Sequence, residues 1–435
     1  MTVSSEVLAR VWSELGEPQH ATLTFSEPAL PVALPSRLAA GDLAWASVAA
    51  VTLAARGDAS SLSPDRIAVA YRSDRVLTID GVAPPVWSPF SGFWRTTDGW
   101  VRTHGNYPHH AAGLRRALGL HDAVDADHVR AVLAERTSQE AVASIVAAGG
   151  LAVEVRPEDP TRDAALRAHP LLDIRRHEDA APPSIAHTTN HGRPLDGIRV
   201  LDLTRVIAGP VCARTLALLG ADVLRIDPPD LPEPEWQHLD TGHGKRSALL
   251  DARSPRLHEL LASADVVVLG YRPAALTRLG IDPDQLSDRY PGLIVARLSA
   301  WGADAPERAG FDSLVQAESG IALIESPDAD RPGALPAQAL DHSAGYLLAA
   351  AVTALIRRRA TDGGSWQAQI SLRRVAAELL GMPRTTSPAD ERAIDAALHT
   401  QRFEVNGHEL VTAAPVVPGI EFATPRPWGQ AQARW

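Results

Sequence analysis

The sequence contains a single cysteine, Cys212, among 435 residues. One cysteine can form neither an intrachain disulfide nor a cysteine metal cluster, and such low usage fits a reducing cytoplasm. Basic residues are also in the minority, because 42 Lys and Arg stand against 52 Asp and Glu, a formal net charge of −10. An acidic surface repels nucleic acids and anionic membranes, so neither is expected as a partner.

Long hydrophobic runs are missing as well. No segment approaches the roughly 20 apolar residues of a transmembrane helix. The most apolar run, 346–356, ends in three arginines, so it predicts a buried helix whose cationic end complements the helix dipole. The first 20 residues include acidic side chains and no continuous apolar stretch, which does not predict a secretory signal. We therefore expect a folded cytoplasmic protein.

Sixteen histidines are present, but their spacing does not match a metal site such as His-Glu-x-x-His on one helix. The glycines of 242–245 do not have the spacing of a phosphate-binding P-loop either. We expect no bound metal. The clustered histidines are interpreted as exposed or linker residues, namely His109, His110, His187, His191, His238 and His243.

From Leu195 onward, short apolar runs alternate with helical segments of about ten residues. The runs are GIRVLDLT (197–204), ADVLRID (221–227), DVVVLGY (265–271) and GLIVARLSAWG (292–302). This alternation is typical of βαβ units on a parallel sheet, and continuously apolar strands are covered by helices on both faces. The sequence therefore predicts a Rossmann-like α/β domain over about 195–300, an architecture that alone assigns no function.

The chain before this domain predicts a second, smaller α+β domain. FWRTTDGWV (93–101) has aromatic residues on both sides of a TTDG turn, which indicates a β-hairpin. Helical patterns follow near 109–119 and 126–148, whereas RIAVAYRSDRVL (66–77) predicts a strand that runs into a helix. The expected organisation is an N-terminal helical segment with a partial copy of the large domain (1–89), the small domain (90–170), a linker (171–192), the large domain (193–383) and a closing segment (384–435).

Two Ala-rich segments far apart in the chain resemble each other. Residues 40–56 match 339–357 when a gap of two residues is allowed. A short turn, an alternating segment and an Arg-containing segment follow in both places. The shared order predicts an internal duplication in which Asp42 is the counterpart of Asp341, and we interpret Asp42 mainly as a helix cap or a relic.

The segment PLDGIRVLDLTRVIAGPVCARTLALLGADVLRID (194–227) resembles the opening of the family III CoA-transferases. Six further blocks resemble the family in its order, at 242–252, 266–281, 293–302, 309–320, 340–358 and 363–372. Seven blocks in order make the resemblance specific. Residues 90–170 resemble the smaller domain, which follows the large domain in ordinary members. The resemblance therefore implies a fused or permuted arrangement.

The resemblance implies that the protein moves coenzyme A between carboxylic acids, with an acyl-CoA and a small carboxylic acid as substrates and no tightly bound cofactor. It implies a homodimer, interlocked in ordinary members. By position the attacking carboxylate is Asp341, and backbone N–H groups near Ser343, Ala344 and Gly345 are candidates for oxyanion stabilisation. Read without the resemblance, Asp341 is an ordinary helix N-cap.

Coenzyme A carries several phosphates, so an acidic protein must supply cations locally. The candidate binding residues are Lys245, Arg246, Tyr271, Arg272 and Arg278, together with the backbone of Val206, Ile207 and Ala208 at the carboxyl end of the first strand. The alternative for each cation is a solvated surface charge. Pro228 stands where some members carry a phosphate-binding arginine, a departure from the family pattern.

Two other functions stay open. Acyl-CoA racemases and epimerases share the pattern but place a proton-transferring histidine in the motif equivalent to AGFD (309–312), where this chain has Phe311. A non-catalytic CoA-binding protein is the third possibility, because the domain order and Pro228 depart from ordinary members.

Overall fold

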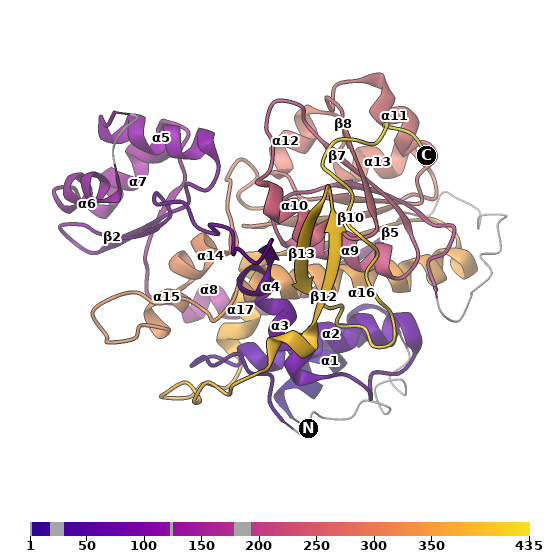
Figure 1. Ribbon diagram of the computed structural model, residues 1–435, viewed down its shortest axis with the longest axis horizontal. Helices are drawn as coiled ribbons and strands as arrows, with labels where there is room; N and C mark the ends of the chain where they lie inside the picture. Colours follow the sequence, from indigo (N-terminus) through magenta and orange to yellow (C-terminus); the bar gives the residue numbers. More distant parts are fainter. Residues whose placement is uncertain (1, 18–29, 122–124, 178–192) are drawn as a thin grey trace.

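The computed structural model describes residues 2–17, 30–121, 125–177 and 193–435 (Figure 1). Its centre is a seven-stranded sheet in the order β5-β11-β10-β9-β6-β7-β8. The strands are β5 (Asp173–His177), β6 (Arg199–Leu203), β7 (Asp222–Asp227), β8 (Lys245–Leu249), β9 (Val266–Leu269), β10 (Ile294–Ser299) and β11 (Ser365–Ser371). All pair in parallel except β5, which is antiparallel to β11.

Counted along the chain, the six parallel strands lie in the order 3-2-1-4-5-6, which is that of the doubly wound dinucleotide-binding fold. Alternate residues of the central strands β6, β7, β9 and β10 enter two separate cores. Val200 and Val266 belong to one core, and their neighbours Leu201 and Val267 to the other. Because both faces are covered, β9 is buried throughout. The predicted α/β class with a Rossmann-like large domain is confirmed.

Helices cover both faces of this sheet (Figure 1). The helices of the large domain are α9 (Ala208–Leu218), α10 (Glu235–Thr241), α11 (Pro255–Leu261), α12 (Pro273–Arg278), α13 (Pro283–Arg289), α14 (Asp312–Ser319), α15 (Ile321–Ile324), α16 (Ala339–Asp362) and α17 (Leu372–Gly381), of which α14 and α15 lie toward the small domain. Local signals start several of them: Ser254 and Asp282 cap α11 and α13, and each cap is followed by proline, which suits a first helical turn.

The long helix α16 crosses beneath the sheet and packs against α9 and against α2 (Ala40–Arg56). Its 24 residues are sufficiently long and apolar to cross a membrane, contrary to the expectation that no segment approaches that length. Its most apolar window is wholly buried inside the protein, so α16 serves here as a core helix. The apolar run ends where Arg359 bonds the carboxylate of Asp265 at 2.8 Å.

The small domain lies to one side of the sheet (Figure 1, left). It contains β2 (Gly92–Arg95), β3 (Trp100–Thr103), β4 (Ala152–Glu154), α5 (Pro108–Leu118), α6 (Ala126–Ala134) and α7 (Ser138–Ala147), around a core of its own. The predicted hairpin is present, with Arg95 paired to Trp100. The single helix predicted over 126–148 is instead two helices, because Thr137 starts α7 with a capping box.

Two predictions about connecting segments are wrong. The segment 66–77 is helical rather than a strand, forming α3 (Pro64–Tyr71) and α4 (Ser73–Val76) after a Ser63 cap. The predicted resemblance between the two segments therefore holds for the helices α2 and α16 but not for the strand β11, which has no counterpart after α2. The expected linker contains β5, which extends the main sheet, after α8 (Pro160–Arg167). Its remainder, 178–192, lies outside the described residues.

Both chain ends pack onto this framework. The N-terminal helix α1 (Val3–Glu14) packs on α2. At the other end, η2 (Ala396–His399) leads into the hairpin of β12 (Thr400–Val405) and β13 (His408–Ala413), and β13 also pairs with β1 (Thr78–Ile79). The last residues run past β8, where Ala248 pairs with Gln430.

Candidate active site

Asp341 lies in the first turn of α16, three residues after the N-cap Gln338. The interpretation of Asp341 as the N-cap is therefore wrong. The residue is 6% exposed, and its carboxylate accepts no hydrogen bond from the described residues. A buried carboxylate usually has such partners. Without a hydrogen-bond partner among the described residues, the carboxylate oxygens of Asp341 are free to react with a substrate.

The cap of α16 comes instead from Asp312, the first residue of α14. Oδ2 of Asp312 accepts a 2.9 Å hydrogen bond from the backbone N–H of Asp341. Gln316 donates to the other oxygen of Asp312 and accepts from the backbone N–H of Leu335 at 2.9 Å. Asp312 therefore stabilises the helix terminus that presents Asp341, and it belongs to the AGFD segment.

The two carboxyl groups influence each other's ionisation. Burial raises the pKa of Asp341 well above its usual value, and the negative charge of Asp312 raises it further. Burial raises the pKa of Asp312 to about 6, an increase limited by the hydrogen bonds from Asp341 and Gln316. Neighbouring buried carboxylates resist carrying two negative charges at once. Proton occupancy at Asp341 is thus coupled to that at Asp312.

The predicted oxyanion donors do not fit this geometry. Ser343, Ala344 and Gly345 follow the first turn of α16, and N–H groups beyond the first turn donate to carbonyls within the helix. The hydroxyl of Ser343 is also occupied, by Tyr71 at 3.0 Å. The prediction that these three N–H groups stabilise an oxyanion is wrong.

A cavity of about 270 Å³ opens at the carboxyl ends of β6 and β9, and Asp341 forms part of its wall. These two strands flank the point where the strand order reverses, which is where doubly wound sheets bind ligands. Of the predicted binding residues, Val206, Ala208, Tyr271 and Arg272 line this cavity. Ile207 lies beside it, in the wall of a second cavity.

Arg205 also lines the larger cavity and was missed in the sequence. Its Nε lies 3.4 Å from Oδ1 of Asp227, and its ring neighbour is Tyr107, 5.6 Å from the guanidinium carbon. Its Nη2 is buried and has no hydrogen-bond partner among the described residues. Arg205 precedes Val206 and follows an apolar strand, and this position could have identified it as a binding residue in the sequence.

The backbone at Val206 is strained. Its φ is 70°, a value that β-branched residues rarely adopt. The conformation is held by Glu233, which accepts a 2.7 Å hydrogen bond from the N–H of Val206 and forms a buried ion pair with Arg225. Strain of this kind, observed in a cavity wall, points to a functional site.

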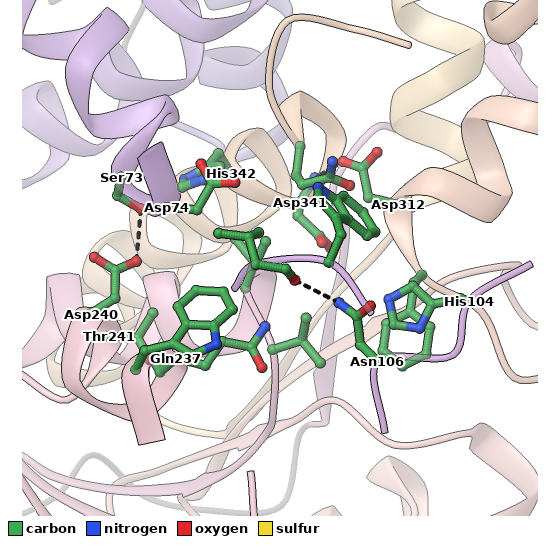
Figure 2. Close-up of a pocket in the computed structure, with 17 residues that line it drawn as sticks. Ser73, Asp74, His104, Asn106, Gln237, Asp240, Thr241, Asp312, Asp341 and His342 are labelled. Carbon is green, nitrogen blue, oxygen red and sulfur yellow. Dashed lines mark hydrogen bonds between the residues drawn. The ribbon is translucent and has the colours of Figure 1, made fainter. Parts of the chain in front are cut away.

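A second cavity of about 40 Å³ also has Asp341 in its wall (Figure 2). Val206, Phe311 and Asp341 line both cavities. The other walls of the smaller cavity come from distant parts of the chain, with Asp74 from α4 and His104 from the small domain. A single chain thus supplies the N-terminal segment, the small domain and the large domain around Asp341.

Three predicted binding residues lie elsewhere. The ammonium of Lys245 is buried and bonds Asp202 at 2.9 Å and the carbonyl of Pro210 at 3.0 Å. This position does not fit the predicted phosphate contact, because a cation surrounded by core residues cannot reach a ligand. Arg246 pairs with Asp222, and Arg278 with Glu307. Both are more exposed, and their roles stay predictions.

Of the histidines expected to be exposed, His109 is exposed and His110 is partly exposed, whereas two others are not. His238 and His243 are buried, and they bond the closing segment through the carbonyls of Arg426 at 2.8 Å and Ala423 at 3.0 Å. His187 and His191 lie outside the described residues. Within the described part of the chain, no group of three or more His, Cys, Asp or Glu residues is arranged to hold a metal ion.

Comparison with known proteins identifies a family to which the sequence is similar. The profile of CoA-transferase family III matches residues 195–429, more than half of the chain. A probable fatty acyl-CoA transferase of Mycobacterium tuberculosis is 34% identical over 211 residues, covering 44% of this chain and 54% of that protein. A formyl-CoA:oxalate CoA-transferase of Rhodopseudomonas palustris is 28% identical over 260 residues, covering 56% of each chain.

An (R)-2-hydroxy-4-methylpentanoate CoA-transferase of Clostridioides difficile is 30% identical over 217 residues, covering 44% of this chain and 54% of that protein. The chain thus spans about half of the length of these curated relatives. Among solved structures, the hypothetical protein Rv3272 of Mycobacterium tuberculosis aligns with a TM-score of 0.41 and 34% identity, covering 43% of this chain and 56% of that chain.

Proposed function

Because the chain belongs to CoA-transferase family III, we propose that it transfers coenzyme A from an acyl-CoA to a carboxylic acid, with Asp341 as the nucleophile. The observation that carries this proposal is the position of Asp341. Its carboxylate is buried and free of hydrogen bonds from the described residues, and Asp341 lines two cavities. A desolvated carboxylate is a stronger nucleophile than one in water.

The proposed reaction begins when an oxygen of Asp341 attacks the thioester carbonyl carbon. The C–S bond breaks and leaves a mixed anhydride and a CoA thiolate. The thiolate attacks the Asp341 carbonyl carbon, which releases the donor acid as a carboxylate and forms an aspartyl-CoA thioester. The acceptor carboxylate attacks that carbon and expels the thiolate. The thiolate finally attacks the acceptor carbonyl, so that the new acyl-CoA forms and Asp341 is regenerated.

The larger cavity is the proposed CoA site. It lies at the reversal of strand order and contains the cations Arg205 and Arg272, which an anionic nucleotide requires in a protein of net charge −10. The buried Nη2 of Arg205 lacks a partner among the described residues. A phosphate oxygen of CoA would supply that missing hydrogen bond.

One observation bears on the racemase or epimerase alternative. The ring of His104 stacks on Phe311 with 4.0 Å between centroids, so an imidazole is present beside the position where Phe311 replaces a histidine. Burial lowers the pKa of His104 to about 3, which makes it a poor proton acceptor. Transfer is therefore favoured over racemisation. If the protein incorporated deuterium at the α-carbon of a 2-methylacyl-CoA in D₂O, the racemase or epimerase function would be favoured over transfer.

The test of transfer compares Asp341→Asn with Asp42→Asn. Asp42 occupies the first turn of α2 as Asp341 occupies that of α16, so it is a matched control. We expect Asp341→Asn to lose at least about 10³-fold in CoA transfer while it still binds CoA, and Asp42→Asn to keep its rate. Mass spectrometry of wild-type protein treated with an acyl-CoA should find the adduct on Asp341.

An unchanged rate in Asp341→Asn would contradict the nucleophile assignment. CoA binding without any exchange in the wild-type protein would support the non-catalytic alternative instead. The homodimer and the cytoplasmic location stay predictions. Light scattering on the purified protein measures the first, and fractionation of the cells measures the second.

A further inference from the structure

The 40 Å³ cavity has a defined position relative to the proposed CoA site. It shares Val206, Phe311 and Asp341 with the larger cavity, and its other walls come from α4, α10 and the residues around His104 (Figure 2). If CoA occupies the larger cavity with its thioester at Asp341, the acyl group can enter the adjoining smaller cavity. The smaller cavity is therefore the space available to the acyl chain.

The cavity is small and has aromatic walls. Its volume of about 40 Å³ is far below the several hundred Å³ of a typical ligand pocket. Trp87, Trp236 and Phe311 form part of the wall. Trp236 is partly buried and packs against a cluster that includes Leu239 and Leu410, and Phe311 is stacked on His104. The rigid rings limit the length of an acyl chain.

The charges around the cavity have one sign. Asp74, Asp240 and Asp312 line it together with Asp341, and the described residues of its wall include no Lys or Arg. Asp240 accepts a 2.7 Å hydrogen bond from Ser73, which holds it in place. Arg214 pairs with Asp240 at 3.6 Å from behind the wall, so it compensates one of these four carboxyl groups. A second carboxylate on the acyl chain would still face an excess of carboxyl groups, which is unfavourable at a buried site.

Two polar side chains of the small domain line the cavity, and one of them, Asn106, donates to the carbonyl of Val86. His104 is 5% exposed and its Nδ1 is buried, without a hydrogen-bond partner among the described residues. Burial keeps the ring neutral, since it lowers the pKa to about 3. A neutral imidazole fixed against Phe311 can hydrogen-bond an oxygen of a neutral acyl group, and it offers no charge to a carboxylate.

We propose that this cavity is the acyl subsite and that it selects short, uncharged acyl groups. The inference rests on the proposed transfer activity. It defines the substrate class through His104 of the small domain and Trp87, which directly precedes that domain. It also makes Trp87 a specificity-determining residue, because this side chain lines the cavity and is 40% exposed.

The test measures kcat/KM for acetyl-, propionyl-, hexanoyl- and succinyl-CoA with acetate or propionate as acceptor. We expect the two short donors to exceed hexanoyl- and succinyl-CoA by at least about tenfold, as is typical of a pocket that rejects extra methylenes. Trp87→Ala should raise the hexanoyl-to-acetyl ratio about tenfold or more. Trp100→Ala, in the same domain but outside the cavity wall, should leave that ratio unchanged.

The outcomes separate the two proposals. Equal use of short and long donors, or a ratio that Trp87→Ala does not change, would overturn the acyl subsite and leave CoA transfer intact. Transfer from none of the donors would overturn the proposed function and the subsite with it. A preference for succinyl-CoA would overturn the argument from charge, and the assignment of this cavity as a site for uncharged chains.

Discussion

The backbone N–H of Asp341 donates a 2.9 Å hydrogen bond to the carboxylate of Asp312. This contact joins the first turn of α16 to the first residue of α14, 29 positions earlier in the chain. It brings two buried carboxyl groups together, and each affects the ionisation of the other. Asp312 therefore both positions the proposed nucleophile and controls its charge.

Replacing Asp312 by Asn should shift the pH dependence of transfer. The negative charge of Asp312 raises the pKa of Asp341, and a neutral amide removes that contribution. Asp341 would then lose its proton at lower pH, so the acid limb of the kcat/KM profile should move downward by about one pH unit. A pH–rate profile from pH 4 to 9 measures this shift.

Asp304→Asn is the control for this experiment, because Asp304 is an exposed carboxylate in the connection that leads to α14. It should leave the acid limb in place. An unchanged profile in Asp312→Asn would show that Asp312 has no electrostatic effect on the reacting group. Thermal melts of both variants would separate this effect from a loss of the α16 cap.

Asp341→Asn should stabilise the fold at neutral pH while it removes turnover. The pKa of Asp341 is raised in the folded state, so the stability of the wild-type protein is greatest below the unfolded-state pKa and falls as pH rises through the folded-state pKa. An amide avoids that loss. We expect a melting temperature higher by about 1–3 °C at pH 8.

The same comparison at pH 4 should show little difference between the two proteins, because Asp341 is then protonated in both the folded and part of the unfolded population. Differential scanning calorimetry at the two pH values measures the effect. If Asp341→Asn were less stable than wild type at pH 8, the buried negative charge of Asp341 would not destabilise the folded protein, and the prediction would be wrong.

Val206→Gly should relieve backbone strain. A φ of 70° is unfavourable for valine and ordinary for glycine. This substitution should therefore not cause the loss of stability that a valine-to-glycine change usually causes. We expect a free energy of unfolding within about 0.5 kcal/mol of wild type, or above it. Val86→Gly, at a similarly half-buried position in a loop, should lose about 1 kcal/mol.

Urea denaturation of both variants provides the measurement. If Val206→Gly is destabilised as much as Val86→Gly, the conformation at Val206 is not strained. Weaker CoA binding in a stable Val206→Gly variant would show that the backbone at this turn is set for the ligand rather than for the fold.

Arg205→Ala should weaken CoA binding by about tenfold or more, because it removes a cation from the proposed nucleotide cavity. Asp227, its carboxylate partner, keeps bonds from Arg225 and Trp428, so the fold should persist. Titration calorimetry with CoA at two salt concentrations measures the loss. Arg205→Lys should recover part of the affinity.

The control is Arg253→Ala, since Arg253 is a solvent-exposed arginine of the same domain. Its affinity for CoA should equal that of wild type. Equal binding by Arg205→Ala and wild type would place the nucleotide elsewhere and would favour the positions of Arg246 and Arg278.

Much of the large domain follows from short-range pattern. The strands β6, β7, β9 and β10 were predictable because each is a short apolar run between helices, a local property that burial on both sheet faces requires. The hairpin of the small domain was predictable from its turn. The strand β8 was not recognised, because it begins with the charged pair Lys245 and Arg246.

Other elements depended on long-range packing. The helix α3 was misread as a strand because RIAVAY alternates over too few residues to distinguish the two periods. In the structure its apolar residues all pack into the core, from Ile67 to Tyr71. The strand β5 pairs with β11, almost 200 residues away in the chain, and no local signal marks such a partner.

The sequence by itself determined the fold class, the family resemblance and the position of Asp341, because these depend on apolar spacing and on ordered blocks of residues. Only the tertiary structure showed that Asp312 caps α16, that Lys245 is a core ion pair, and that the small domain closes one side of the pocket. Burial and hydrogen bonding are properties of contacts between distant segments. They decide whether a carboxylate or a cation is free to meet a substrate.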